Sequence, residues 1–160
     1  MEAKSVKETL VNIAHVMLPQ DANIMGNVHG GAIMKNIDNA AGVVAVRHVR
    51  CNAVTASIDR LDFHSPVFVG DLLTLKASLN YAGKTSMEIG VRVETEDLIT
   101  GEIRHTASAY LTFVAMDRIG KPKQIPPLIS ETDEEKRRRS EAAERRKIRL
   151  SEKKNKKHKG

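Results

Sequence analysis

The sequence has little cysteine, few aromatic residues and no long apolar stretch. Cys51 is its only cysteine, which excludes an internal disulfide framework and zinc sites built from several cysteines. Aromatic residues make up 3% of the chain, too few for the stacking platforms of single-strand nucleic-acid binders. No apolar run approaches the ~20 residues of a membrane span, and Met1 to Glu8 lack the apolar centre of a secretory signal. We therefore expect a cytoplasmic protein with no membrane span and no specific nucleic-acid partner.

Common catalytic and metal-binding motifs are also missing. Neither the Gly-x-Ser-x-Gly pattern of serine hydrolases nor a phosphate-binding loop occurs. The histidines are scattered singly, and none has the spacing to another that a metal site requires. The residues therefore predict no metal site.

The net charge of +6 is confined to one end of the chain. Residues 1–130 hold 13 Lys+Arg and 13 Asp+Glu, whereas residues 131–160 hold the other 13 Lys+Arg and only 7 Asp+Glu. A length of 160 residues suits one domain, since a domain typically has about 150 residues. We expect that domain over residues 5–128, a charged helical extension over 129–150 and a basic disordered tail over 151–160.

Hydrophobic periodicity predicts one long helix followed by strands. Between Ala32 and Val49 apolar residues recur at helical spacing on nearly all sides, which is typical of a buried helix. A less regular alternation over Val6 to Met17 suggests a strand before it. After the helix the period changes to two, which predicts four strands over the segments Val54–Asp59, Leu73–Leu79, Met87–Glu94 and His105–Ala115.

This order of elements indicates an α+β fold. The last four strands are separated by turn residues rather than by crossover helices, which excludes a doubly wound parallel sheet. We expect them to pair in chain order as an antiparallel meander. An amphipathic sheet beside one apolar helix predicts a curved antiparallel sheet wrapped around a long central helix.

The most informative polar residue is Asp38, inside the apolar helix. A carboxylate there is costly to bury without a partner, and desolvated carboxylates gather at functional sites. Such a group is a competent general base or nucleophile. A helix face that simply reaches water or another subunit remains the alternative.

A glycine turn precedes the same helix. Gly30 and Gly31 leave backbone N–H groups free at the helix start, where they can bind an anion or stabilise an oxyanion. Plain conformational preference is the alternative for these glycines. On sequence grounds alone, Asn23 is a turn residue.

The run from Asp21 to Asp38 resembles the signature of the hot-dog-fold acyl-CoA thioesterases. The likeness is greatest to the brain-type cytosolic enzymes and covers residues 6–150. Further matches are Ala40–His48, Val54–Asp59, Asp62–His64 and Lys84–Ile89.

The resemblance implies hydrolysis of a fatty acyl-CoA thioester to a free acid and CoA, with no cofactor beyond the CoA of substrate and product. The family's catalytic asparagine and aspartate fall on Asn23 and Asp38. Asp38 is expected to act as general base or nucleophile, while Asn23 of a partner subunit orients the water or the carbonyl. The expected assembly is a homodimer with shared active sites, and further a hexamer built as a trimer of dimers.

The resemblance also suggests where the substrate lies. The amides of Gly30 and Gly31 are candidates to stabilise the oxyanion. Asn27 is a second polar candidate at the mouth of the site. Candidate contacts to the CoA moiety are Thr55, Ala56, Ser57, Lys84, Thr85 and Ser86, with Arg47 and Arg50 as possible phosphate ligands.

Two other functions compete with hydrolysis. One is a hot-dog hydratase or dehydratase acting on a 3-hydroxyacyl thioester, which needs a paired histidine and carboxylate at the substrate carbons. The other is a non-enzymatic acyl-CoA-binding hot-dog sensor. Thiol release from acyl-CoA separates the three.

Overall fold

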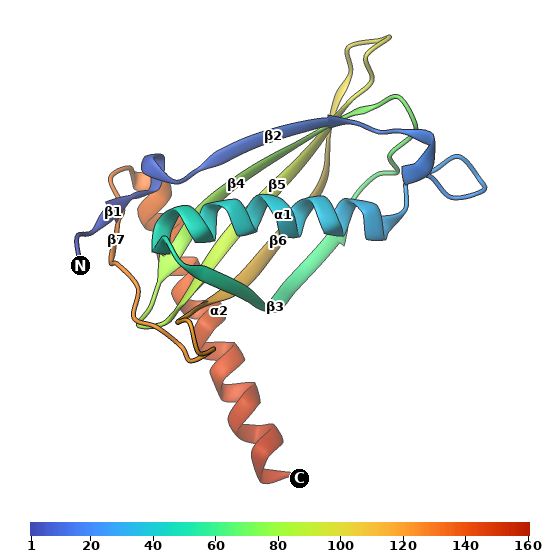
Figure 1. The fold of residues 1–160 in the computed structure, drawn as a ribbon. Coiled ribbons are helices and arrows are strands. Elements are labelled where there is room, and N and C mark those ends of the chain that lie inside the picture. Colours follow the sequence, from blue (N-terminus) through green and yellow to red (C-terminus); the bar gives the residue numbers. More distant parts are fainter.

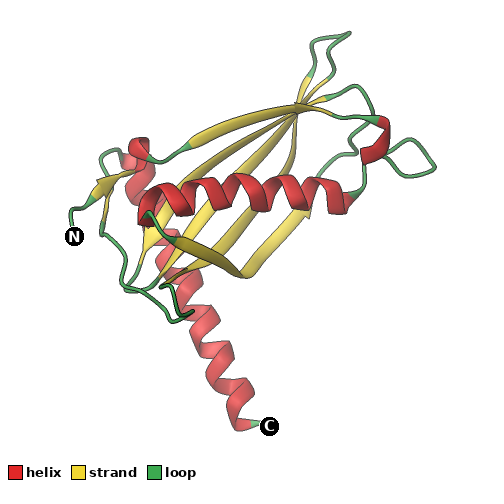
Figure 2. Cartoon of the chain, in the orientation of Figure 1, coloured by secondary structure: helices red, strands yellow, loops and turns green.

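A computed structural model describes residues 1–160. One long helix lies against a curved five-stranded antiparallel sheet, and a second helix lies on the sheet's other side and extends past it (Figure 1; Figure 2). This arrangement confirms the expected α+β fold. The elements are β1 (Lys4–Ser5), β2 (Val11–Val16), α1 (Gly30–Val49), β3 (Asn52–Phe63), β4 (Leu72–Ala82), β5 (Ser86–Glu96), β6 (Ile103–Met116), β7 (Leu128–Ile129) and α2 (Asp133–His158).

The first strand of the sheet is shorter than its sequence suggested. Only Val11–Val16 pairs with β4, because Val6–Glu8 forms one turn of 3-10 helix. Glu8 closes this turn by accepting hydrogen bonds from the backbone N–H and the hydroxyl of Ser5. A local capping box therefore overrides the weak alternation at this end.

The expectation that four strands pair in chain order was wrong. The sheet order is β2-β4-β5-β6-β3, so only β4, β5 and β6 form a meander. α1 crosses the concave face, and β3 follows it at the edge away from β2 (Figure 1). Residues 64–71 then return the chain to β4. Alternation of apolar and polar residues indicates which side chains share a face of the sheet. It does not indicate which strands are neighbours, so the sequence pattern could not predict the strand order.

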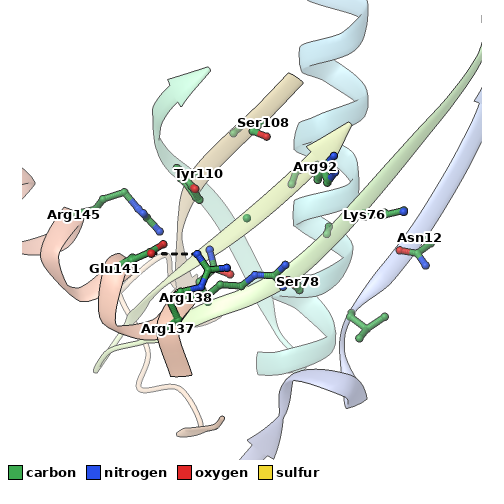
Figure 3. A pocket seen from close by; sticks show the side chains of 16 residues that line it. Asn12, Lys76, Ser78, Arg92, Ser108, Tyr110, Arg137, Arg138, Glu141 and Arg145 are labelled. Atoms are coloured by element: carbon green, nitrogen blue, oxygen red, sulfur yellow. Dashed lines mark hydrogen bonds and ion pairs between the residues drawn. The ribbon is translucent and has the colours of Figure 1, made fainter. Parts of the chain in front are cut away.

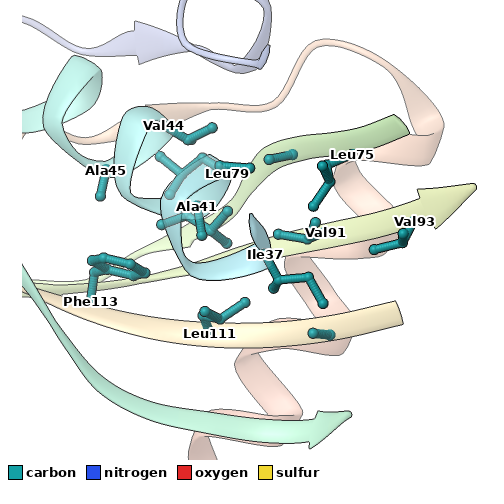
Figure 4. Close-up of a cluster of buried hydrophobic side chains, with 14 of the residues drawn as sticks. Ile37, Ala41, Val44, Ala45, Leu75, Leu79, Val91, Val93, Leu111 and Phe113 are labelled. Atoms are coloured by element: carbon teal, nitrogen blue, oxygen red, sulfur yellow. The ribbon is translucent and has the colours of Figure 1, made fainter. Parts of the chain in front are cut away.

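The main core lies between α1 and the concave face of the sheet (Figure 4). Helix residues at i, i+4, i+8 and i+11 spacing point to the sheet, among them Ile33, Ile37, Ala41 and Val44, all at most 3% exposed. They meet inward-facing side chains of the central strands such as Leu75, Leu79, Ile89, Val91, Leu111 and Phe113. Each large apolar side chain buried in this way contributes about 1.5–3 kcal/mol.

One face of α1 is not buried, contrary to the expectation of a helix enclosed on nearly all sides. Met34, Val43 and Val46 are 37–44% exposed. The sheet covers only one side of the helix, so the apolar residues of its opposite side meet solvent in the single chain.

Helix α2 docks on the convex face of the sheet. Its N-terminus is closed by a capping box between Thr132 and Glu135. Ala142 is 1% exposed against the strands. Arg145 donates two hydrogen bonds, of 2.7 and 3.1 Å, to the carboxylate of Glu88, and its guanidinium lies 3.7 Å from the centre of the Tyr110 ring. These contacts hold the middle of α2 on the sheet.

The end of α2 corrects the prediction of a disordered tail over residues 151–160. The helix continues to His158 with every residue from Ser151 onward exposed. This stretch contains no proline or glycine before the last residue, and lysine and glutamate are good helix formers. Lysines in the last turn also interact favourably with the helix dipole. Neither helix of the protein is apolar enough over a sufficient length to cross a bilayer.

Candidate active site

The loop that holds Asn23 is closed by its own hydrogen bonds. Asn23 and Asn27 are joined by a backbone N–H to carbonyl bond of 2.7 Å. The Asn23 Oδ1 atom accepts from the backbone N–H groups of Met25 at 2.9 Å and Asn27 at 3.2 Å. Gly26 takes a φ of +85° at the tip, a conformation suited to glycine. The carboxamide oxygen of Asn23 is thus engaged within its loop, and its Nδ2 group is left free to donate.

The first turn of α1 presents two free backbone donors. The helix begins at Gly30 without a side-chain cap from His29. The first backbone N–H groups that donate in this turn belong to Ala32 and Ile33, both to the His29 carbonyl. The amides of Gly30 and Gly31 have no acceptor and both residues are exposed, so these two N–H groups are available to a ligand.

Asp38 lies in the third turn of α1 and is half-buried. Its Oδ1 atom accepts a hydrogen bond of 2.6 Å from the hydroxyl of Thr55 on β3. Oδ2 has no partner in the chain. The pair therefore fixes one carboxylate oxygen and leaves the other open to a substrate or a water molecule.

Asp38 lines a groove of about 680 Å³ between α1 and β3. This volume lies in the range of ~300–1,000 Å³ usual for small-molecule sites. The groove combines the carboxylate of Asp38 with apolar side chains. Its lining consists of Asp38, Asn39, Gly42, Val43, Val46, Arg47, Ala53, Val54, Thr55 and Phe113.

A β-bulge follows Thr55 directly. In the register with β6, Thr55 faces Phe113 and Ser57 faces Thr112, so Ala56 is the extra residue. The Ser57 hydroxyl is buried without a hydrogen-bond partner. Bulges re-aim side chains and are common beside active sites, and this one lies next to the residue that holds Asp38.

The two segments predicted to contact CoA lie at the same end of the sheet. Ser86 on β5 pairs with Val114 on β6, which pairs in turn with Val54 on β3. The segments are two strand spacings apart, or about 10 Å. Thr85 precedes this row, and its carbonyl accepts from the N–H of Ala115.

The predicted basic contacts occupy different positions. Arg47 lines the groove and donates from Nη1 to the Leu10 carbonyl at 2.9 Å. Arg50 is the exposed residue that ends α1, in a left-handed conformation with φ of 52°. Lys84 is exposed in the β4–β5 turn. Of these three basic residues, only Arg47 lines the groove that contains Asp38.

The single chain does not bring Asn23 to Asp38. The groove around Asp38 includes neither Asn23 and Asn27 nor Gly30 and Gly31. Seven residues of helix separate Gly31 from Asp38, a rise of about 10 Å. The predicted site residues thus fall into two groups: the Asn23 loop with the start of α1, and the groove with Asp38 and Thr55.

The sequence did not predict the contact between Thr55 and Asp38. Thr55 was predicted as a CoA contact, and in the structure its hydroxyl also donates to the carboxylate of Asp38. The two residues are 17 positions apart, on a helix and on an edge strand. No local periodicity links them, so only the packing of α1 on β3 could reveal the pair.

A long helix packed against the concave face of a curved antiparallel sheet is the arrangement of the hot-dog fold. The family model described as "Thioesterase superfamily" matches residues 25–102. The chain is 40% identical over 134 residues to the uncharacterized acyl-CoA thioester hydrolase YkhA of Bacillus subtilis, covering 84% of this chain and 78% of that one. The chain belongs to the thioesterase superfamily.

Longer relatives are also similar. The cytosolic acyl coenzyme A thioester hydrolase of the mouse is 36% identical over 139 residues, which cover 86% of this chain and 36% of the relative. The chain therefore spans about a third of the length of that relative.

Two crystal structures match closely. An apo-hexameric acyl-CoA thioesterase has a TM-score of 0.90 and 38% identity, with 95% of this chain and 97% of that chain covered. An acyl-CoA hydrolase from Staphylococcus aureus, in complex with butyryl coenzyme A, coenzyme A and coenzyme A disulfide, has a TM-score of 0.86 and 38% identity, with 98% and 97% covered.

The similar structures include three single variants of the S. aureus enzyme, in which alanine replaces an asparagine, an aspartate or a threonine. The spacing of these three residues along that chain equals the spacing of Asn23, Asp38 and Thr55 here.

Proposed function

We propose that this protein hydrolyses acyl-CoA thioesters to a carboxylic acid and CoA. The observation that carries the proposal is the Asp38–Thr55 pair, a carboxylate with one anchored oxygen at an otherwise largely apolar groove. The names of its relatives, acyl-CoA thioester hydrolases from bacteria and the mouse, support the same activity. The proposed chemistry uses no metal or redox cofactor.

In the proposed reaction Asp38 acts on the thioester carbon directly or through water. As a general base, Oδ2 accepts a proton from a water molecule, whose oxygen bonds to the thioester carbon. As a nucleophile, the carboxylate attacks that carbon and water then cleaves the anhydride. In both versions the C–S bond breaks, and the CoA thiolate leaves and takes up a proton.

Thr55 is a positioning residue in this scheme. Its hydroxyl donates to Oδ1, which holds the carboxylate in one rotamer with the second oxygen toward the groove. A base held in one orientation accelerates the reaction more than a mobile base, because its alignment with the substrate is established before the reaction.

The amides of Gly30 and Gly31 are proposed as the oxyanion donors. They are free and exposed at the start of α1, where the helix dipole also favours negative charge. Asn23 can add its free Nδ2 group as a donor to the same carbonyl oxygen or to the water. These groups lie outside the Asp38 groove of the same chain, so the scheme requires a second subunit.

We propose a homodimer that completes each site with residues of both chains. β3 is an edge strand, exposed along most of its length, beside the exposed apolar residues Met34, Val43 and Val46 of α1. The tip of the Asn23 loop exposes Ile24 and Met25, at 102% and 80%. Unpaired edges and apolar patches of this kind mark interfaces between chains. The hexameric thioesterase of the same fold supports further assembly as a trimer of dimers.

The CoA moiety is proposed to follow the row from Val54 to Ser86 at one end of the sheet. Ser86, Thr85 and the backbone of the bulge offer polar groups there, and Arg47 lines the adjoining groove. Lys84 and Arg50 are exposed and available to phosphates that extend past the groove. A cytoplasmic location is also proposed, in line with the cytosolic mouse relative.

Release of free CoA thiol from acyl-CoAs of graded chain length tests the proposed function. A thiol-reactive chromophore reports steady turnover if the protein is a hydrolase. Stoichiometric binding of acyl-CoA without thiol release would instead identify a sensor. Hydration of an enoyl-CoA without thiol release would identify a hydratase.

A further inference from the structure

The last turns of α2 do not touch the sheet. The middle of the helix is held on the strands, where Arg145 reaches the ring of Tyr110 (Figure 3). The last contact of this kind is the ion pair between Arg149 and Asp59 of the edge strand β3. From Ser151 to His158 every residue is exposed, and the helix continues past the sheet (Figure 1). Residues 150–160 are therefore the free end of α2, and the proposed hydrolysis makes no use of them.

This free end is strongly basic. It holds five lysines and a single acidic residue, Glu152. Since the last ion pair of α2 is made by Arg149, none of these lysines has a carboxylate partner within the chain. Lys153 and Lys157 are one turn apart, and like charges at this spacing destabilise a helix. An anionic surface would remove that repulsion. The five are Lys153, Lys154, Lys156, Lys157 and Lys159.

The turn after β6 exposes an apolar side chain among further cations. Asp117 Oδ1 accepts from the backbone N–H groups of Ile119 and Lys121, both at 2.9 Å. Gly120 takes a φ of +80° in this turn, a conformation suited to glycine. Ile119 is 76% exposed at the tip, and Arg118 beside it is also exposed. The turn thus holds an apolar residue in solvent with basic residues on both sides.

This turn and α2 belong to the same end of the sheet. The exposed Lys123 follows the turn, and the N–H of Ile125 donates to the Lys84 carbonyl in the β4–β5 turn at 2.9 Å. A Cβ on Gly83 of the β4–β5 turn would lie 3.8 Å from Arg146 Nε of α2. The chain after β6 therefore contacts the β4–β5 turn, which in turn contacts α2. We call this surface the basic end; it consists of Arg118, Ile119, Lys121, Lys123 and α2 from Arg146 to Lys159.

Apolar residues are also interleaved with the cations of α2. Ile148 is 60% exposed and Leu150 41% exposed. Leu150, Lys153 and Lys157 recur at i, i+3 and i+7, so they share one face of the helix. Lysine can lay its apolar stem along such a face while its charge stays in water. Cations combined with exposed apolar residues are typical of helices that lie on a membrane surface.

The composition of the basic end favours lipid over nucleic acid. The last ten residues contain lysine but no arginine, whereas arginine is the preferred residue for recognising nucleic acids. Exposed isoleucine and leucine have no role against a phosphodiester backbone, but they gain from burial at the boundary between headgroups and acyl chains. Clusters of about four to eight Lys and Arg are attracted to anionic lipid surfaces.

We propose that the basic end docks this protein on an anionic lipid membrane, with the lysines of α2 at the headgroups and Ile119 entering the interface. The protein would then be bound to the surface, without crossing the bilayer. Long acyl chains partition into bilayers, so docking would bring the Asp38 groove close to acyl-CoAs of that kind. The docking goes beyond the proposed hydrolysis and does not depend on it.

Flotation of the full chain with lipid vesicles tests the docking. At ~150 mM salt we expect binding to vesicles of phosphatidylcholine with phosphatidylserine, and none to phosphatidylcholine alone. The triple variant Lys153→Gln, Lys154→Gln and Lys157→Gln should lower the partition coefficient by about a hundredfold, because each lysine near such a surface contributes roughly a fivefold factor. Absence of binding by the wild type would overturn the proposal.

A second triple variant with the same net charge is the matched control. Lys35, Lys136 and Arg139 are exposed and lie outside the basic end. Their joint substitution by Gln should leave the partition coefficient within a few-fold of the wild type. Circular dichroism verifies that both triple variants are folded. Equal losses in the two would show that net charge alone drives binding, which would contradict a defined docking surface.

A fluorescent probe tests the orientation on the membrane. The chain has no tryptophan, so Ile119→Trp introduces a single indole at the basic end. Its emission should shift to shorter wavelength when phosphatidylserine vesicles are added. Ile99→Trp places the indole in the β5–β6 turn, at the other end of β5, where Ile99 is 95% exposed. Its emission should not shift. A shift for Ile99→Trp only, or for neither variant, would contradict insertion of the basic end.

Nucleic acid is the competing partner. An electrophoretic mobility shift with double-stranded DNA at the same salt concentration measures it. Retardation of DNA by a protein that does not float with anionic vesicles would assign the basic end to nucleic acid and overturn the proposal. Vesicle binding is measured without acyl-CoA, whereas thiol release is measured without vesicles. A failure of the docking is thereby distinguished from a failure of the proposed hydrolysis.

Discussion

The hydroxyl of Thr55 on β3 donates a hydrogen bond of 2.6 Å to Oδ1 of Asp38 on α1. This contact joins the helix to the edge strand at the groove and leaves the second carboxylate oxygen without a partner in the chain. Substitution of Thr55 therefore tests the positioning of the Asp38 carboxylate while the carboxylate itself is retained.

Thr55→Val keeps the shape of the side chain and removes the donor. We expect kcat for acyl-CoA hydrolysis to fall about tenfold to a hundredfold with little change in KM, because a displaced base affects the chemical step. Thr55→Ser, which retains the hydroxyl, should recover most of the activity. Equal losses in both variants would show that Thr55 acts through packing, and steady-state kinetics distinguishes the cases.

Mixed oligomers test whether each site takes residues from two chains. Asn23→Ala and Asp38→Ala should each be inactive as pure oligomers. After subunit exchange, a mixed dimer has one site with both residues intact, so activity should reappear toward half that of the wild type per mixed dimer. Differently tagged chains, purified together, establish that exchange has occurred. No recovery in that material would contradict shared sites.

The ion pair between Arg145 and Glu88 is expected to anchor α2. Glu88 is only 3% exposed and also accepts from Asn80 Nδ2 at 3.1 Å. Arg145→Met leaves this carboxylate buried without its cation, which should lower the free energy of unfolding by about 3 kcal/mol. Urea denaturation measures the loss.

The double variant Glu88→Gln with Arg145→Met removes both charges and should be more stable than Arg145→Met alone. Arg139→Ser, at an exposed position of the same helix, should change stability by less than about 0.5 kcal/mol. If Arg145→Met were as stable as the wild type, the ion pair between Arg145 and Glu88 would not anchor α2.

His48 predicts a dependence of stability on pH. It is fully buried, its Nε2 lies 2.8 Å from the Pro126 carbonyl, and burial lowers its pKa below the ordinary 6.5. At pH values just below 6.5, His48 is therefore protonated in the unfolded chain but still neutral in the folded chain. Stability should be full above pH 6.5 and should fall as the pH drops from there toward the lower pKa of the folded state.

Melting temperatures between pH 7.5 and 5.5 measure this effect. His48→Gln retains a donor for the Pro126 carbonyl and should flatten the profile in this window, although it costs some stability at neutral pH. The groups with lowered carboxyl pKa values, Glu8 and Glu94, act below pH 4.5 and do not interfere. An unaltered pH profile in His48→Gln would assign the effect to another group.

The sequence predicted the main elements because their patterns are local. The apolar spacing from Ile33 to Val44 located α1, and alternation located β3 to β6 to within a few residues. The family resemblance, which the comparisons confirm, selected Asn23 and Asp38 as site residues.

Features that depend on long-range packing could not be predicted from the hydrophobic pattern of the sequence. The edge position of β3, and with it the Thr55–Asp38 bond, depends on how α1 crosses the sheet. The left-handed conformations of Arg50 and Arg60, with φ of 52° and 51°, are held by a helix end and a bulge rather than by residue preference. The helical end of α2 was not predicted, because a highly charged stretch of low complexity is typical of disorder, although lysine and glutamate also favour a helix.

The most direct test of the account is the turnover of Asp38→Asn. This variant keeps the size of the side chain and can still accept from Thr55, but it cannot act as base or nucleophile. We predict a folded protein whose kcat for a long-chain acyl-CoA is lower by a hundredfold or more, the contribution of about 10²–10⁴ expected of a general base. Thiol release within a few-fold of the wild-type rate would contradict the assignment of Asp38 as the reacting carboxylate.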